Sequence, residues 1–280
     1  MYKGKIGVAI ISFNRPKYLS RVINSLEQQS YLENTKFHLF QDGFKNIFSG
    51  KIKAKKEDIE QSISIFKSSN LDKGGSILRV DQNVGNGRNQ FTANEIMSSL
   101  YDYFLVIEDD VLLSPDYFRL CRVLIDQFGN RSDLHSFNLN FKKLSKPTEK
   151  TLNKVIFAET HWWAECYISR RWKIAKEYFK DYFRLIEEVD YSDIPREKIQ
   201  ELFKKYNFTK TQCSQDAGKD FSLFRAKFKR MTAVVNRGFY IGQQGIHFTP
   251  KLYQKMGWQN QLPYIFKSDQ SLDQFILIEK

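Results

Sequence analysis

The chain is poor in the residues that build disulfide frameworks and zinc sites. Its 280 residues include three cysteines and four histidines. Cys121, Cys166 and Cys213 lie far apart, and none belongs to a CxxC pair. An odd number of cysteines without paired spacing argues against both a disulfide scaffold and a zinc site. Such cysteine usage is typical of a reducing compartment, so we expect a cytoplasmic protein.

Long apolar runs and glycine-rich motifs are also missing. No stretch approaches the roughly 18 apolar residues that a membrane-spanning helix needs. The first apolar run, IGVAIISF (6–13), is short and continues into Asn14-Arg15-Pro16 without a small-residue cleavage site, which argues against a signal peptide. NVGNGRN (83–89) matches neither GxGxxG nor GxxxxGK[ST]. The sequence therefore predicts a soluble or peripheral protein without a P-loop.

Positive charge and aromatic rings are abundant. The chain has 44 Lys and Arg against 32 Asp and Glu, a net charge of +12, and 15% of its residues are aromatic. This balance favours anionic partners such as nucleotides, nucleic acid or an acidic membrane face. A non-enzymatic nucleic-acid-binding module would explain both features, but no RRM, KH or zinc-finger motif is present. We therefore expect no nucleic-acid partner.

Apolar runs alternate with helical patterns in the first half of the chain. The run at 6–13 is continuously apolar, as in a strand buried on both faces of a parallel sheet. Asn14 can cap, and Pro16 can open, the helix that follows. The pattern then repeats, with strands at 37–40, 77–80 and 103–107 and helices around 59–66, at 88–100 and after 114–116. This order predicts an α/β fold with a mainly parallel sheet.

The second half departs from this alternation. After a further apolar segment (135–141) and a polar stretch, the patterns indicate helices over 161–183, from Pro195 to about 206, and over 220–231, with the basic stretch 225–230 facing solvent. We therefore divide one domain into two halves, 1–141 and 142–280.

Three consecutive carboxylates interrupt the apolar segment FLVIEDDVLLSPDY (104–117). Glu108, Asp109 and Asp110 follow a buried strand, where like charges about 4 Å apart repel by about 4 kcal/mol at an effective dielectric near 20. Carboxylates and phosphate oxygens together suit Mg²⁺ or Mn²⁺. Open α/β sheets bind ligands at the carboxyl ends of their strands, and QDG (41–43) and NVGNGRN (83–89) follow neighbouring strands. The pattern predicts a site for a divalent cation and a phosphate-bearing ligand.

Three segments carry a family resemblance. IGVAIISFNRPKYLSRVINSL, FQDG and FLVIEDDVLLSPDYF, in this order, resemble the GT-A glycosyltransferases, most closely the N-acetylglucosaminyltransferase I type. The resemblance implies a GT-A (Rossmann-like) fold, with a mixed, mainly parallel sheet flanked by helices. The first half would then bind a nucleotide sugar, and the helix-rich second half would bind the acceptor and carry the catalytic base.

The resemblance also implies roles for particular residues. Arg15 matches the arginine of the first turn, Asp42 matches a uridine-binding aspartate, and Asp110 matches the aspartate that binds Mn²⁺ or Mg²⁺. The remaining donor contacts that it implies are Glu108 and Asp109 toward the sugar and ribose, Arg88 toward the diphosphate or sugar, and His247 toward the metal or diphosphate.

The catalytic base is expected at a helix start. The segment 218–248 resembles the family's acidic helix start, strand and glycine-containing loop, which makes Asp220 the candidate base. Asp216 is the alternative, because QDAGKD offers two acids and has Gly-Lys-Asp where the family has Trp-Asp-Asp. Such a carboxylate would take the proton of the attacking hydroxyl.

The resemblance implies a metal-dependent, inverting glycosyltransferase. It would move an N-acetylhexosamine or hexose from a donor, expected to be UDP-linked, to a hydroxyl of a glycan or glycolipid in polysaccharide biosynthesis. The alternative enzyme class, a sugar-phosphate nucleotidyltransferase, would need a glycine-rich loop after the first strand, and SFNRPKY has no glycine. The positive charge is compatible with peripheral attachment to an anionic inner membrane face.

Overall fold

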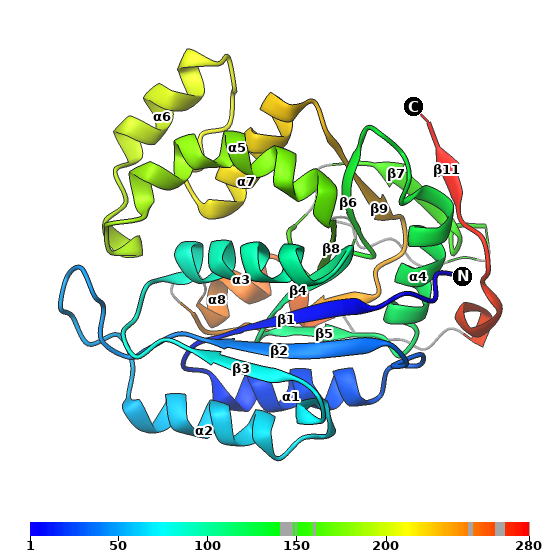
Figure 1. Cartoon of the computed structure of the whole chain (residues 1–280), viewed down its shortest axis with the longest axis horizontal. Helices are drawn as coiled ribbons and strands as arrows, with labels where there is room; N and C mark the ends of the chain where they lie inside the picture. The colour runs from blue at the N-terminus through cyan, green and yellow to red at the C-terminus, as the bar shows by residue number, and fades with distance from the viewer. Residues whose placement is uncertain (141–147, 149, 159–160, 246–248, 261–266, 280) are drawn as a thin grey trace.

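A nine-stranded sheet forms the centre of the molecule (Figure 1). The computed structural model describes residues 1–140, 148, 150–158, 161–245, 249–260 and 267–279. The strand order is β11-β7-β9-β6-β8-β4-β1-β2-β3. Four neighbouring parallel strands come from the first half: β1 (Ile6–Ser12), β2 (Thr35–Gln41), β3 (Ser76–Arg79) and β4 (Tyr103–Glu108).

The remaining strands make the sheet mixed. β8 (Glu165–Ile168) pairs antiparallel with both β4 and β6 (Leu134–Asn138), and β9 (Lys229–Ala233) pairs parallel with β6. β7 (Lys154–Phe157) and β11 (Ile276–Ile278) complete this side. A separate two-stranded sheet joins β5 (Val111–Leu113) to β10 (Gly238–Tyr240). The large sheet thus takes strands from both halves of the chain.

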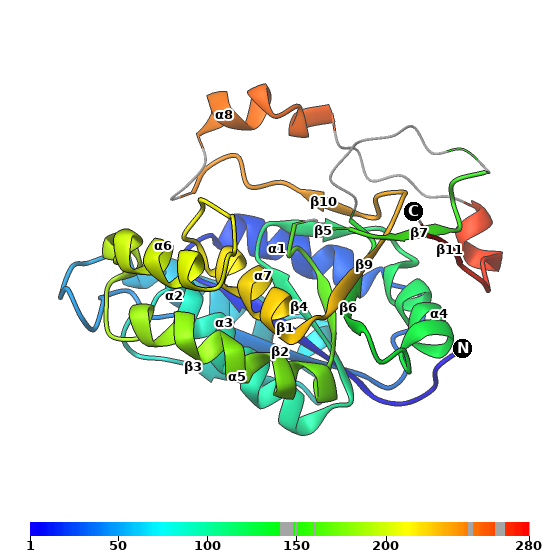
Figure 2. The same ribbon diagram turned by 90° about the horizontal axis from the view of Figure 1, so that it is seen from above.

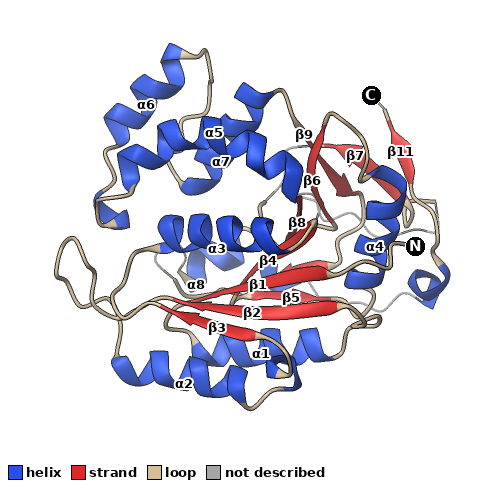
Figure 3. Ribbon diagram, in the orientation of Figure 1, coloured by secondary structure: helices blue, strands red, loops and turns tan. Residues whose placement is uncertain are grey.

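Helices cover both faces of the sheet (Figure 3). One core cluster includes the apolar sides of α1 (Pro16–Glu27), α2 (Lys56–Lys67) and α4 (Tyr117–Phe128). The other includes α3 (Asn86–Leu100), α5 (Ser169–Ile186), α6 (Arg196–Lys205) and α7 (Gln215–Ala226). Figure 2 shows α8 (Pro250–Lys255) beyond the small sheet. Short 3-10 helices span Asn70–Asp72, Tyr191–Asp193, Trp258–Asn260 and Lys267–Ser271.

The first strand shows why the sheet is buried on both sides. Ile6, Val8 and Ile10 belong to one core cluster, whereas Ala9 and Ile11 belong to the other. Successive side chains of a strand point to opposite faces, so a strand between two helical layers needs apolar residues at every position. The α/β fold and the mixed, mostly parallel sheet predicted from the sequence are confirmed. Within the described residues, no helix is long and apolar enough to cross a membrane.

Three local predictions were wrong. The helix expected over 161–183 begins only at Ser169, because Glu165–Ile168 forms β8. The helix expected over 220–231 ends at Ala226, since Lys227 adopts a left-handed conformation with φ of 58° and β9 starts at Lys229. Asn14 does not cap α1. The N-cap is Arg15, which makes no side-chain capping bond, although Pro16 opens the helix as predicted.

Candidate functional site

Arg15 and the last two carboxylates of the triplet meet at one edge of the sheet. β1 pairs in parallel with β4, with Ile11 opposite Glu108, so the residues that follow these two strands emerge side by side. Arg15 Nη1 lies 2.6 Å from Asp110 Oδ2, and its Nη2 pairs with Asp109 Oδ1. The backbone N–H of Phe13 also donates to Asp109, at 3.4 Å. One guanidinium therefore joins two buried carboxylates.

The electrostatics of this cluster follow from its burial. Burial raises the pKa of Asp110 to about 7, against the opposing effect of Arg15. Burial alone would lower the pKa of Arg15, but Asp109 and Asp110 raise it above its usual value. Burial, and next the charge of Asp216, raise the pKa of Glu108. Because burial disfavours the charged forms of these carboxyl groups even beside Arg15, a further cation would stabilise them in the ionised state.

Several buried polar atoms at this edge of the sheet have no hydrogen-bond partner in the part of the chain that the structure describes. Asp110 Oδ1 is buried and has no hydrogen-bond partner among the described residues, and the same is true of Ser12 Oγ and Gln41 Oε1 at the ends of β1 and β2. Buried polar atoms are rarely left unpaired. A free carboxylate oxygen fits one coordination position of Mg²⁺ or Mn²⁺, which take their other ligands from phosphate and water. No group of three or more His, Cys, Asp or Glu side chains that could hold a metal ion is found in the described residues.

The segment after β10 closes over this cluster. Ile241 N–H donates to the Asp110 carbonyl at 2.8 Å. A Cβ at Gly242 would overlap both Asp110 Oδ2 and Tyr240 Oη, so only glycine allows the backbone this close. Burial, and next the charge of Asp110, raise the pKa of Tyr240. The sequence analysis missed Tyr240 and Gly242, although their segment GFYIGQQG resembles the family's donor loop.

A second group of side chains extends from Glu108 toward α7. Gln90 Nε2 donates to Glu108 Oε1 at 2.6 Å, and Lys219 Nζ donates to Gln90 Oε1 at 2.6 Å. Lys219 is buried and lies 3.4 Å from Asp216 Oδ1. The sequence analysis missed Gln90 and Lys219. Their signals were available, since Gln90 directly follows NVGNGRN and Lys219 belongs to the Gly-Lys-Asp triplet.

The two base candidates occupy different surroundings. The Asp220 carboxylate accepts from Lys210 Nζ at 2.5 Å and from Trp162 Nε1 at 3.1 Å, and it lies 3.7 Å from Arg230. Burial raises the pKa of Asp220, and Arg230 and Lys210 oppose this. Asp216, in the first turn of α7, has a side chain that is 45% exposed, compared with 12% for Asp220. Asp216 is therefore the more accessible carboxylate, and it lies on the Glu108 side.

Asp42 is enclosed by hydrogen-bond donors from its own chain. Its Oδ1 accepts from the N–H groups of Gly43 and Val84 at 2.9 and 2.8 Å. Its Oδ2 accepts from Asn83 Nδ2 and from the Gly85 N–H at 2.7 and 3.1 Å. Burial raises the pKa of Asp42 to about 6, and the three backbone donors oppose that rise. The carboxylate thus holds the 83–85 turn at the edge of the site.

Arg88, another donor-binding candidate, makes its contacts away from the cluster. Arg88 donates to the Glu187 carbonyl at 2.9 Å, and its guanidinium lies 5.7 Å from the centroid of the Phe48 ring. His247 lies outside the described residues.

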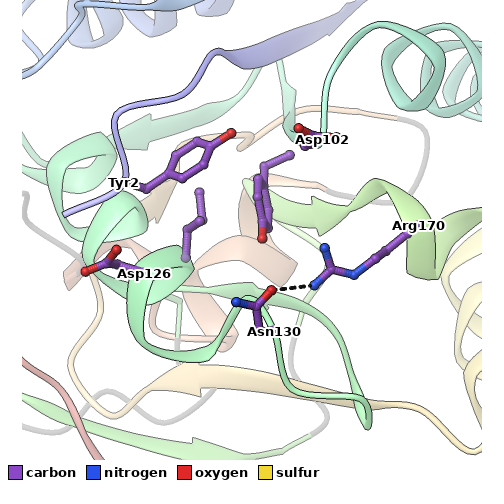
Figure 4. Close-up of a pocket in the computed structure, with 7 residues that line it drawn as sticks. Tyr2, Asp102, Asp126, Asn130 and Arg170 are labelled. Atoms are coloured by element: carbon purple, nitrogen blue, oxygen red, sulfur yellow. Dashed lines mark hydrogen bonds between the residues drawn. The ribbon is translucent and has the colours of Figure 1, made fainter.

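A hollow of about 330 Å³ lies at the opposite end of β4 (Figure 4). Two of the charged groups that line it, Arg170 and Asp126, already have partners. Arg170 donates to the Gly129 carbonyl at 2.6 Å and to Asn130 at 3.1 Å, and Asp126 pairs with the N-terminal ammonium at 3.2 Å. We therefore place the candidate site at the edge that carries the acidic triplet.

Comparisons with solved structures return low-identity matches. The mannosyltransferase PcManGT from Pyrobaculum calidifontis, in complex with GDP-Man and Mn²⁺, matches 83% of this chain at 9% identity and a TM-score of 0.48. S. aureus TarS matches 66% at 14% identity and a TM-score of 0.44. A TarS fragment (1-349) in complex with UDP matches 60% at 15% identity and a TM-score of 0.41. The matches span 55%, 32% and 48% of those three chains, respectively. No protein-family profile matches the sequence, and no curated protein matches it.

Proposed function

We propose that the chain is a metal-dependent, inverting GT-A glycosyltransferase. It would transfer an N-acetylhexosamine or hexose from a UDP-linked donor to a hydroxyl of a glycan or glycolipid acceptor. The observation that carries the proposal is the pairing of the partly exposed Arg15 with the buried Asp109 and Asp110 at the carboxyl edge of the sheet, with Asp110 Oδ1 unpartnered among the described residues. This arrangement suits a diphosphate, because Arg15 offers a guanidinium and Asp110 a free carboxylate oxygen beside it.

On the donor side, the proposed residues bind and orient the nucleotide sugar. A Mn²⁺ or Mg²⁺ ion held by Asp110 Oδ1 would neutralise charge on the leaving diphosphate. Arg15 would contact the diphosphate, and Glu108 and Asp109 would face the donor sugar and ribose. Asp42 would act through the 83–85 turn that its carboxylate holds, and Arg88 toward the diphosphate stays a prediction.

On the acceptor side, we propose Asp216 as the general base. Both carboxylate oxygens of Asp220 already accept hydrogen bonds, from Trp162 and Lys210, whereas Asp216 is half-exposed and makes one long ion pair with Lys219. A base must reach the acceptor hydroxyl and take its proton as the oxygen attacks the anomeric carbon. A single carboxylate is sufficient for inversion, because no covalent sugar–enzyme intermediate forms.

Donor hydrolysis and ligand-induced stabilisation test this proposal. The purified chain is incubated with Mn²⁺ and a panel of nucleotide sugars, and release of the nucleoside diphosphate is measured. We expect slow release from one donor, and a rise in the unfolding temperature with UDP that requires Mn²⁺. Absence of release from every donor, together with no shift for any nucleoside diphosphate plus metal, would exclude the proposed function.

A further inference from the structure

The hairpin 44–53 is a surface that the proposed reaction does not use. It connects β2 to α2 and projects from the molecule at the end where β1 and β2 terminate, as both Figure 1 and Figure 2 show. Ile47 and Ile52 on this hairpin are 46% and 73% exposed. Lys45 pairs with Ile52 across the hairpin, so the side chains of Lys45 and Ile52 lie on the same face. Two large aliphatic side chains therefore stand in water on a projecting hairpin.

Hydrogen bonds and an ion pair fix the hairpin to the rest of the molecule. Asn46 is buried, donates to Asn83 Oδ1 at 3.0 Å, and accepts from the N–H groups of Phe48 and Ser49. Asp190 anchors the other strand, because its carboxylate accepts from Ser49 Oγ at 2.5 Å and pairs with Lys53 at 2.7 Å. These bonds fix the turn, so the exposure of the isoleucines is imposed by the fold.

The charged residues within the segment 44–56 are all basic. Residues 44–56 contain five lysines and no acidic residue. Lys51 and Lys53 pair with Asp193 and Asp190. Lys45, Lys55 and Lys56 are exposed and have no ion pair within the described part of the chain. Ile47 also lines a hollow of about 530 Å³ beside Val80 and Val84. Asp81, which lines it too, lies 3.8 Å from Arg79.

We propose that this hairpin docks the protein on an anionic phospholipid bilayer. Lys45 of the hairpin, with Lys55 and Lys56 at the start of α2, would lie among anionic headgroups, and Ile47 and Ile52 would enter the boundary of the acyl chains. A bilayer fits better than nucleic acid, because the segment has no arginine and its exposed apolar groups are aliphatic, whereas single strands are bound by stacking on aromatic rings or guanidinium planes. Docking there would turn the carboxyl edge of the sheet, and the proposed site, toward the membrane surface. Vesicle binding is measured without donor or acceptor, so the proposal does not depend on the transfer reaction.

Cosedimentation of the full chain with vesicles tests the proposal. We expect binding to vesicles of phosphatidylcholine with phosphatidylglycerol, weak binding to phosphatidylcholine alone, and loss of binding as the Debye length falls from about 10 Å at 0.1 M salt to about 3 Å at 1 M. A triple variant, Lys45→Gln with Lys55→Gln and Lys56→Gln, should bind roughly a hundredfold more weakly, at about fivefold per lysine. Ile47→Ser with Ile52→Ser should bind at least about tenfold more weakly, because two aliphatic side chains are lost from the acyl boundary.

Matched controls distinguish binding through the hairpin from binding through the overall positive charge or through any exposed aliphatic side chain. Lys3→Gln with Lys5→Gln and Lys67→Gln removes the same charge at the other end of the sheet, before β1 and at the end of α2. Ile174→Ser on α5 removes an isoleucine that is 46% exposed, as is Ile47. Both controls should bind like the unmodified chain, and all variants should melt like it, since the substituted side chains are exposed.

Three outcomes would overturn the proposal. The first is no binding to anionic vesicles. The second is an equal loss in the control lysine triple or no loss in the isoleucine double, which would leave only non-specific charge. The third is stronger binding to single-stranded RNA at equal phosphate concentration, with the lysine triple losing that binding, which would make the hairpin a nucleic-acid surface.

Discussion

At the residue scale, Arg15 explains how the acidic triplet is tolerated at the end of a buried strand. Its guanidinium joins Asp109 and Asp110, and Gln90 donates to Glu108. A buried carboxylate without such partners would cost several kcal/mol. Arg15 brings one positive charge to this point, and the divalent cation that the sequence analysis expected here stays a prediction. Asp110 Oδ1 has no hydrogen-bond partner among the described residues, and the proposed metal ion would bind to this oxygen.

Asp110→Asn tests the role of that oxygen. An amide is a much poorer ligand for a hard divalent cation than a carboxylate, and the substitution also removes one of the two carboxylates that pair with Arg15. We expect the Mn²⁺-dependent affinity for UDP to fall at least about tenfold, measured as the loss of ligand-induced stabilisation. Asp126→Asn, at the opposite end of the sheet, is the control and should leave UDP binding unchanged. Undiminished UDP binding in Asp110→Asn would remove Asp110 from the metal site.

Asp216→Asn and Asp220→Asn separate the two base candidates. Loss of a general base lowers the rate of transfer by about 10²–10⁴-fold. Asp216→Asn should therefore keep UDP binding and stability but lose transfer, because its carboxylate is half-exposed. Asp220→Asn should lower the free energy of unfolding by about 1–3 kcal/mol, because it removes the negative charge with which Lys210 and Arg230 pair. If Asp220→Asn instead abolishes transfer at unchanged stability, Asp220 is the base.

At the element scale, predictions from the sequence were most accurate for segments whose structure follows from their own local residue pattern. The runs at 6–13 and 103–107 became β1 and β4 because their apolar residues serve two helical layers. The segment 220–231, which spans the end of α7 and the start of β9, could not be read this way. Phe221, Phe224 and Phe228 have helical spacing, yet Lys227 breaks the helix and Arg230 belongs to β9. Arg230 bonds to Glu165, 65 residues away, and no local pattern reveals such a partner.

Arg230→Met measures what that long-range pair contributes. Arg230 donates from Nε and Nη2 to Glu165 at 3.1 and 2.7 Å, and both side chains are buried. Removing one partner of a buried pair costs about 3–5 kcal/mol, because the remaining charge stays uncompensated. We expect that loss in urea unfolding of Arg230→Met. Lys229→Met, one residue earlier in β9 and 55% exposed, should change the free energy by less than about 0.5 kcal/mol. Equal effects would show that strand β9, rather than the pair, is sensitive to substitution.

At the scale of the whole molecule, the sheet decides which predicted site residues meet. Parallel neighbours β1 and β4 end at one edge, which is why Arg15 could be placed beside the acidic triplet from the sequence. Gln90 and Lys219 could not be placed, because the hydrogen bond between them spans 129 positions and depends on how α3 and α7 pack. Asp42 was predicted to contact a ligand, and its four donors from the chain itself are visible only in the folded protein.

The stability of the whole molecule should depend on pH through His135. This histidine is buried in β6, and burial, followed by the charges of Arg230 and Lys219, lowers its pKa to about 3. The folded state therefore keeps the ring neutral, while the unfolded chain takes up a proton below about pH 6.5. The stabilisation is complete above that pH and is lost as the pH falls, at about 1.4 kcal/mol per unit, or about 2 kcal/mol by pH 5.

Other buried groups titrate too, including Asp42, whose raised pKa acts in the opposite direction. The quantity to measure is therefore the difference in the free energy of unfolding between the unmodified chain and a His135 variant. Urea unfolding of the unmodified chain and of His135→Asn between pH 5 and pH 8 should give a constant difference above pH 7 and a difference that shrinks by about 2 kcal/mol toward pH 5. A difference that stays constant over the whole range would mean that His135 takes up its proton in the folded protein as readily as in the unfolded chain.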